Sequence, residues 1–249
     1  MSIWQRCAGE KAMQTISGTV YRLVESQEQI ATTAYVDTLG EQAVLEQLLE
    51  RSKPPQPLHS HSLHYLLATP FRYPPLKWGS RFGQKHQPGL FYGATDVPTT
   101  LAESSFYRLV YLESMLSEAM PSKPLSGQHT LFDVGYRTEC GVRLQEPPFD
   151  HYKDAIRHPS DYRTAQRLGT DMRAAGVLCF EYPAARWADG INVALYNGSA
   201  FSANRPTNQQ RFISATGQRQ VEFKNIDTGQ VYSYDTSRFR VDGLLPRPA

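Results

Sequence analysis

The sequence predicts a mixed α+β fold, because runs of strand length outnumber helical patterns and the two do not alternate strictly. A doubly wound parallel sheet would need regular alternation of strand and helix, so the irregular order favours α+β. The composition agrees, since 40% hydrophobic and 11% aromatic residues are typical of a globular protein. A chain of 249 residues is also long enough to bury a sizeable core.

The amino-terminal segment, residues 1–57, contains two predicted elements and a linker. Residues 19–24 form a short β-prone run, and residues 36–51 carry apolar side chains at helical spacing opposite a polar face, which predicts a surface helix. The proline-rich segment 53–57 ends this helix and forms the linker. The segment has too few apolar residues for a core of its own, so we interpret it as a helical extension of one domain over residues 58–249.

The domain after the linker contains the remaining predicted elements. A helix is expected over residues 99–116, opened by a Thr99 cap, and another over residues 161–174, capped by Ser160 or Asp161. Further strands are expected at residues 90–95, 130–136, 177–182, 191–197, 221–226 and 231–234. An Asp-Thr-Gly turn joins the last two strands, so they predict a hairpin.

Composition and charge exclude several classes of protein. The net charge is +2, and the basic residues are scattered among acidic ones, which argues against direct binding of nucleic acid. Cys7, Cys140 and Cys179 lie far apart and form no Cys-x-x-Cys pair, so neither a disulfide framework nor a zinc ribbon is expected. The chain also shows no run of about 18 apolar residues that could span a membrane. It shows no signal peptide. We therefore expect a cytoplasmic protein without a metal.

The densest group of candidate site residues lies between residues 71 and 103. Arg72 and Arg81 stand near turn-forming prolines and glycines, and arginine suits bidentate binding of phosphate. Tyr92 lies in an expected strand, and Glu103 lies beside aromatic residues at the edge of a helix, where a carboxylate is partly desolvated. The residues alone leave a structural interpretation open for each: solvated arginines, a core tyrosine and a first-turn glutamate.

Four short motifs in this region occur in a recognisable order. They are Phe71-Arg72-Tyr73, Gly79-Ser80-Arg81-Phe82, Leu90-Phe91-Tyr92-Gly93-Ala94 and Thr100-Leu101-Ala102-Glu103. Their order and spacing resemble the RES domain, over roughly residues 60 to 205. That family, named for an arginine, a glutamate and a serine, supplies the toxins of bacterial toxin–antitoxin pairs. The resemblance implies an ADP-ribosyltransferase-like sheet core and an enzyme that consumes NAD.

The resemblance also assigns roles to individual residues. Glu103 corresponds to the family glutamate and Tyr92 to a site tyrosine, while Arg72 or Arg81 corresponds to the family arginine. Arg72 is favoured for its aromatic neighbours, with Arg81 and Tyr73 as further binding residues.

The chain departs from the family at one position. Pro183-Ala184-Ala185-Arg186 resembles the family's Pro-Ser-x-Arg signature, so Arg186 matches but Ala184 replaces the serine. Three interpretations stay open: an engineered inactivating substitution, a natural variant of reduced or altered activity, or a different register of the match. Ser199 is a candidate replacement for the missing hydroxyl.

The implied reaction is cleavage of the nicotinamide–ribose bond of NAD, with NAD as substrate and water, phosphate or a protein side chain as acceptor. The resemblance further implies a cognate antitoxin encoded nearby, with which the toxin can form an oligomer. The alternative is a catalytically dead RES-fold protein that binds a nucleotide or a partner. An intercellular effector with the same chemistry is a third interpretation. The acceptor, the oligomeric state and the role of residues 1–57 are left open.

Overall fold

The structure is a computed structural model that describes residues 1–26, 35–75, 77–115 and 123–247. Its centre is one mixed eight-stranded sheet in the order β1-β2-β5-β4-β3-β6-β7-β8, with an additional β1–β3 pairing. The strands are β1 (Gln14–Glu25), β2 (Phe91–Ala94), β3 (Leu125–Arg143), β4 (Cys179–Pro183), β5 (Ile191–Leu195), β6 (Asn208–Thr216), β7 (Gln220–Asn225) and β8 (Val231–Asp235). The helices are α1 (Ile3–Arg6), α2 (Leu39–Ser52), α3 (Tyr65–Arg72), α4 (Val97–Glu113), α5 (Lys153–Ile156) and α6 (Arg163–Ala174). The α+β prediction is confirmed.

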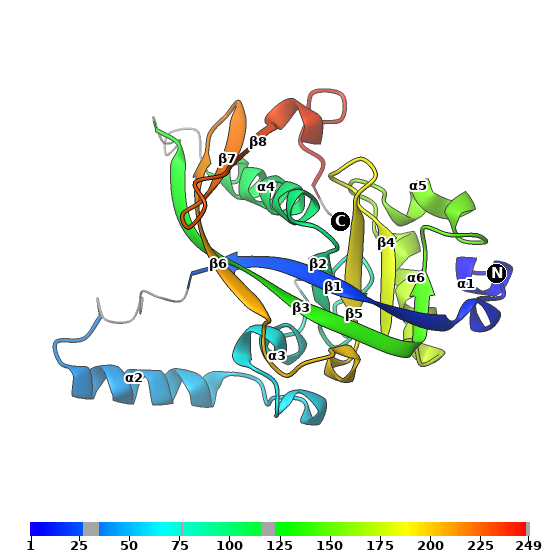
Figure 1. Cartoon of the computed structure of the whole chain (residues 1–249), viewed down its shortest axis with the longest axis horizontal. Helices are drawn as coiled ribbons and strands as arrows, with labels where there is room; N and C mark the ends of the chain where they lie inside the picture. The colour runs from blue at the N-terminus through cyan, green and yellow to red at the C-terminus, as the bar shows by residue number, and fades with distance from the viewer. Residues whose placement is uncertain (27–34, 76, 116–122, 248–249) are drawn as a thin grey trace.

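Five of the strands pair in a closed ring. β1 runs antiparallel to β3 along almost its whole length and also meets β2, where Tyr21 pairs with Ala94. β2, β5, β4 and β3 are consecutive neighbours, so these pairings return to β1. β6, β7 and β8 continue from the other half of β3 as an antiparallel extension (Figure 1). β1 belonged to the predicted extension, yet it is a member of this ring.

Three apolar clusters hold the helices to the sheet. One packs α1 and α6 against Phe82 and Phe180, and another fills the space around Phe91 and Phe132. The third places Phe106 of α4 against the strands β6 to β8. All five phenylalanines are almost completely buried. Each contributes about 1.5–3 kcal/mol relative to an exposed side chain, so these clusters fix where α4 sits.

α4 begins earlier than predicted because a different residue caps it. The Asp96 carboxylate accepts hydrogen bonds from the Thr99 backbone N–H at 2.7 Å and from the Thr99 hydroxyl at 2.9 Å. The N-cap of α4 is therefore Asp96, and Thr99 donates to it. The prediction of Thr99 as the N-cap is wrong. At α6 the predicted cap is also wrong, since the helix starts after Tyr162 without a side-chain cap. Asp161 instead binds its neighbour Arg163.

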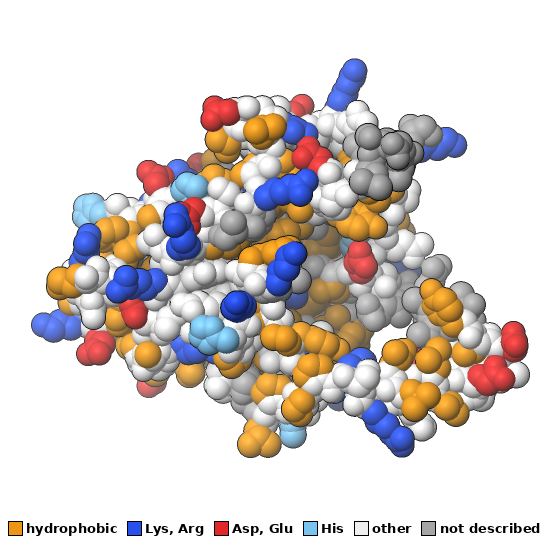
Figure 2. All heavy atoms as spheres, turned by 180° about the vertical axis from the view of Figure 1, so that it is seen from behind, with side chains coloured by type: hydrophobic (Ala, Val, Ile, Leu, Met, Phe, Trp, Pro, Cys, Tyr) orange, Lys and Arg blue, Asp and Glu red, His pale blue; other side chains and the backbone are white. Residues whose placement is uncertain are grey.

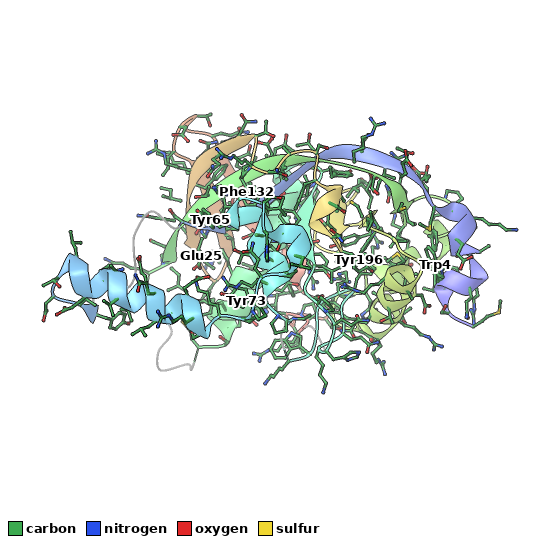
Figure 3. All side chains as sticks on the ribbon, turned by 90° about the horizontal axis from the view of Figure 1, so that it is seen from below. Trp4, Glu25, Tyr65, Tyr73, Phe132 and Tyr196 are labelled. Atoms are coloured by element: carbon green, nitrogen blue, oxygen red, sulfur yellow. The ribbon has the colours of Figure 1, made fainter. Side chains whose placement is uncertain are left out.

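α2 does not pack on the sheet as α4 does, although both were predicted as helices with an apolar face. It projects away from the sheet (Figures 1 and 3), and Gln42 is its only buried residue. Apolar side chains remain exposed on it (Figure 2), namely Leu39, Val44, Leu48 and Leu49. The prediction of a surface helix is confirmed.

Candidate active site

A cavity of about 400 Å³ lies between α4 and the ring of strands. Six of its polar lining residues come from six different elements. They are Arg22 of β1, Arg81 of the loop before β2, Tyr92 of β2, Glu103 of α4, Tyr182 of β4 and Asn192 of β5. The volume is in the range of small-molecule sites, about 300–1,000 Å³.

Glu103 is held in one orientation by two donors. Its Oε1 accepts hydrogen bonds from the Ala185 backbone N–H at 3.2 Å and from Asn192 Nδ2 at 2.8 Å. Its Oε2 makes no hydrogen bond with any residue that the structure describes. The packing of Leu101 and Phe106 fixes α4 and turns Glu103 toward the cavity. One oxygen of an oriented carboxylate is therefore available to a ligand.

Asn192 connects the carboxylate to the sheet. It is only 4% exposed, and its side-chain Oδ1 is buried without a hydrogen-bond partner among the described residues. The amide orientation is set by Glu103, because a carboxylate needs a donor and Nδ2 supplies it. An unsatisfied buried acceptor costs about 1–3 kcal/mol, which a donor on a ligand could offset. The only feature of the sequence that could have pointed to Asn192 is that it is a single polar residue inside an otherwise apolar strand.

Arg81 is the predicted arginine that the structure brings to Glu103. It is 9% exposed, and its Nη1 donates to the backbone carbonyls of Ile156 at 3.2 Å and His158 at 2.8 Å. Its guanidinium carbon lies 4.3 Å from the centre of the Tyr162 ring. Burial opposes its charge, but the electrostatic interactions with Tyr162 and Glu103 outweigh burial and raise the pKa of Arg81. A fixed positive charge therefore lies beside the carboxylate.

Arg22 is a second cation at the cavity, and the sequence did not single it out. Its Nη1 donates to the Tyr92 carbonyl at 3.3 Å, and its guanidinium lies 4.9 Å from the Phe91 ring centre. Burial lowers the pKa of Arg22 to about 10, so it remains charged at neutral pH. It has no carboxylate at ion-pair distance within the described part of the chain. A lone charge in the β-prone run 19–24 was its only signal.

Tyr92 lines the cavity as a neutral phenol. Its hydroxyl accepts from the Phe82 backbone N–H at 3.2 Å and shares a hydrogen bond with Ser80 Oγ at 2.9 Å. Burial raises the pKa of Tyr92, and burial raises the pKa of the neighbouring Tyr182 well above its usual value. Two uncharged aromatic rings therefore flank the carboxylate and offer surface for stacking.

Arg72 and Tyr73 lie outside the cavity. Arg72 ends α3, where its Nη1 pairs with Glu50 Oε1 at 2.6 Å and its Nε donates to the Pro54 carbonyl at 2.6 Å. Tyr73 follows it and is 39% exposed (Figure 3). The preference for Arg72 rested on its aromatic neighbours, but Phe71 points into the core and Glu50 draws Arg72 to α2. The structure thus places Arg81, and not Arg72, beside Glu103.

The loop after β4 supports Glu103 from outside the cavity wall. Ala184 is 3% exposed, and its backbone N–H donates to the Gly190 carbonyl at 2.8 Å. Arg186 donates to the Pro159 carbonyl and lies 3.4 Å from the centre of the Phe106 ring. Arg186 therefore braces the loop whose Ala185 N–H holds Glu103.

The candidate replacement for the serine also lies elsewhere. Ser199 is an exposed residue in a short 3₁₀ helix, Gly198–Ala200, and does not line the cavity. The hydroxyls that do line it belong to Ser80, Thr100 and Ser104, besides the tyrosines.

Two features are absent from the residues that the structure describes. No group of three His, Cys, Asp or Glu side chains there is arranged to hold a metal ion. None of the described helices combines the length and the apolar character that a bilayer span requires.

The comparison with known proteins agrees with the site. No curated protein shows a significant match to the sequence. The RES domain profile matches residues 56–215, which is well over half of the chain. The match contains Arg81, Tyr92 and Glu103, the residues that the fold brings to one cavity. The chain therefore belongs to the RES domain family.

Proposed function

We propose that this protein cleaves the nicotinamide–ribose bond of NAD in the Glu103 cavity. Membership in a family of NAD-related, toxin-like proteins supports the substrate class. The observation that carries the proposal is the orientation of Glu103, whose Oε1 is held by Ala185 and Asn192 while Oε2 has no partner among the described residues.

Glu103 has the properties that the reaction needs. As the bond from ribose C1′ to the nicotinamide nitrogen breaks, its electron pair leaves with nicotinamide and the sugar gains oxocarbenium character. The Oε2 atom of Glu103 would accept hydrogen bonds from the ribose hydroxyls and stabilise this positive charge. Because Oε1 is already fixed, little reorganisation accompanies charge development.

The other lining residues suit the remaining parts of NAD. Arg81 and Arg22 are charged at neutral pH and would bind the pyrophosphate. Tyr92 and Tyr182 would stack on nicotinamide or ribose.

The acceptor of the ADP-ribosyl group is water, phosphate or a protein side chain. Water or a neutral side chain loses a proton as it bonds to C1′, whereas phosphate bonds through an oxygen that is already anionic. The proposal includes a cognate antitoxin, because family members act in toxin–antitoxin pairs. Its terminal segment would enter the cavity and block NAD. Co-purification of the products of neighbouring genes would test that partner.

A second candidate function is a RES-fold protein that binds a nucleotide or a partner without catalysis. Ala184 favours it, since the family serine is missing there. The Glu103 cavity would then retain its charges and aromatic walls and would bind NAD without cleaving it.

The test is NAD loss, measured by chromatography with and without added phosphate. We expect turnover by the natural sequence and a drop of about 10²–10³ in Glu103→Gln, comparable to the loss of one transition-state contact. Glu50→Gln is the matched control, because Glu50 is an exposed glutamate on α2 that is bound to Arg72. Folded protein without turnover in any variant would overturn the enzyme proposal and leave the binding function.

A further inference from the structure

A second cavity, of about 550 Å³, adjoins the Glu103 cavity. The two share three lining residues, Leu23, Ser104 and Tyr107, so a ligand can extend from one to the other. Its other walls come from α4, β1, β3 and β6. Each cavity alone is in the size range of a small-molecule site.

The polar centre of this second cavity is Arg108 of α4. Its Nε donates to Thr216 Oγ1 at 2.8 Å, and its Nη1 lies 3.2 Å from His129 Nε2. It forms no ion pair with any carboxylate of the described residues, and its Nη2 has no hydrogen-bond partner there. Glu25 also lines the cavity, but it is exposed and forms no ion pair with Arg108. Arg108 is thus a partly buried cation that forms no ion pair among the described residues and feels the charge of Glu25 only across the cavity.

His129 holds Arg108 in place without neutralising it. The ring is 4% exposed, and its Nε2 also lies 2.9 Å from Ser214 Oγ. Burial and the nearby Arg108 lower the pKa of His129 to about 4, so the imidazole is neutral at pH 7. A neutral imidazole can accept from Arg108 through Nε2, but it supplies no negative charge.

The surrounding residues keep space around the guanidinium and provide apolar surface. A Cβ atom at Gly127 would lie 2.8 Å from Arg108 Nη2, so glycine there makes room for the arginine. Tyr111, three residues along α4 and 63% exposed, belongs to the same wall, as do Met115 and Leu125. A free phosphate ion would use the cation alone, whereas an aromatic and apolar wall also suits a purine ring.

We propose that the Arg108 cavity binds the adenosine–phosphate half of the dinucleotide, with Arg108 on a phosphate oxygen and Tyr111 on the adenine ring. The assignment of this half to a dinucleotide rests on the proposed function. The Glu103 cavity would then hold the nicotinamide mononucleotide half, with its phosphate at Arg81 and Arg22, and the junction at Tyr107 would hold the bridging oxygen of the pyrophosphate.

Calorimetric titration with AMP and, separately, with inorganic phosphate tests the site without requiring turnover. Arg108→Gln should weaken AMP binding at least tenfold, because a charged contact to phosphate is lost. Tyr111→Ala should weaken AMP binding about fivefold or more and leave phosphate binding unchanged, since stacking on a base is worth about 1–3 kcal/mol. Arg163→Gln is the control, because that arginine is exposed on α6 and pairs with Asp161.

Each outcome decides between the proposals. Unchanged AMP affinity in folded Arg108→Gln and Tyr111→Ala would overturn the subsite. Loss of phosphate binding with AMP binding intact in Arg108→Gln would make the cavity a site for the acceptor phosphate and also overturn it. If Arg108→Gln does not fold, the exposed position of Tyr111 keeps the second variant decisive. AMP binding that depends on Arg108, in a protein without NAD turnover, would support the subsite and contradict the proposed function alone.

Discussion

Two arginine–glutamate pairs of this protein lie in opposite surroundings. Arg81 is 9% exposed and lies in the wall that holds Glu103, while Arg72 pairs with Glu50 where α3 meets the projecting α2. We call the first region the cavity wall and the second, made of α2, the linker and α3, the α2–α3 corner. Both regions present a carboxylate and a guanidinium, but Arg81 is buried and Glu103 half-buried, whereas Glu50 is exposed.

The difference shows how burial changes what opposite charges can do, since Arg72 and Glu50 form an ion pair and Arg81 and Glu103 do not. An exposed pair such as Arg72–Glu50 is screened by water and typically contributes about 0–1 kcal/mol. A buried guanidinium must satisfy its donors, and Arg81 does so on two backbone carbonyls without using Glu103. Glu103 is likewise held by Ala185 and Asn192. Arg81 and Glu103 therefore do not neutralise each other, and each can interact electrostatically with a ligand.

The largest expected effect is that of Arg81→Gln compared with Arg72→Gln. Arg81→Gln removes a buried charge that donates three hydrogen bonds, to the carbonyls of Ile156 and His158 and to the Tyr162 hydroxyl, so we expect the free energy of unfolding to fall by about 3–5 kcal/mol. We expect Arg72→Gln to change it by at most about 1 kcal/mol. Urea unfolding of both variants measures the difference.

NAD turnover gives a second readout for the same two variants. Turnover should fall steeply in Arg81→Gln and stay within twofold in Arg72→Gln. Equal losses in both variants would contradict the distinction between the two regions.

The next effect depends on pH and compares a histidine of the Arg108 cavity with one near the α2–α3 corner. His129 has a folded pKa of about 4, below its unfolded value of about 6.5. Between these values the unfolded chain binds a proton that the folded protein does not, so stability falls as pH drops from about 6.5 to about 4. The loss amounts to at most about 3 kcal/mol and is absent above pH 6.5.

Urea unfolding at pH 7 and at pH 4.5 checks this expectation. His129→Gln should remove most of the change between the two pH values. His61→Gln, at an exposed histidine near the α2–α3 corner, should preserve it. A pH dependence that survives His129→Gln would assign the acid sensitivity to other groups.

The elements that the sequence predicted well are those whose side chains alternate or repeat by hydrophobicity. α4 and the hairpin of β7 and β8 have such patterns and are confirmed. β6 was missed because Ser214 and Thr216 occupy inward-facing positions, where they are buried next to His129 and Arg108. α3 was missed because it is short and contains Pro70, which is a helix breaker in most contexts.

The site could be predicted only where its residues are close in sequence. Arg81, Tyr92 and Glu103 lie within one short window, and the structure brings them to one cavity. Arg22 and Asn192 join them through pairings of β1 with β2 and of β2 with β5. A pairing between strands that are distant in sequence leaves no local signal except a polar residue inside a strand. Such a residue more often has a structural role than a role in a site.

The smallest expected effect concerns Ala184, the position at which the resemblance to the family predicts a serine. The structure separates this position from the cavity lining, since its backbone binds Gly190 and its side chain is 3% exposed. We therefore expect Ala184→Ser to raise NAD turnover by at most about tenfold, or about 1.4 kcal/mol. Ala43→Ser, on an exposed position of α2, should have no effect.

The size of the response to Ala184→Ser separates the interpretations of this position. A rise of about a hundredfold would match the restoration of a missing transition-state donor and would show that a hydroxyl at 184 reaches the ligand. A modest rise would mean that Ser80 and Ser104, which do line the cavity, already supply the hydroxyls that NAD contacts. Folded protein that binds NAD but stays inert with either residue would favour the binding function, because the cavity wall would then be complete without being catalytic.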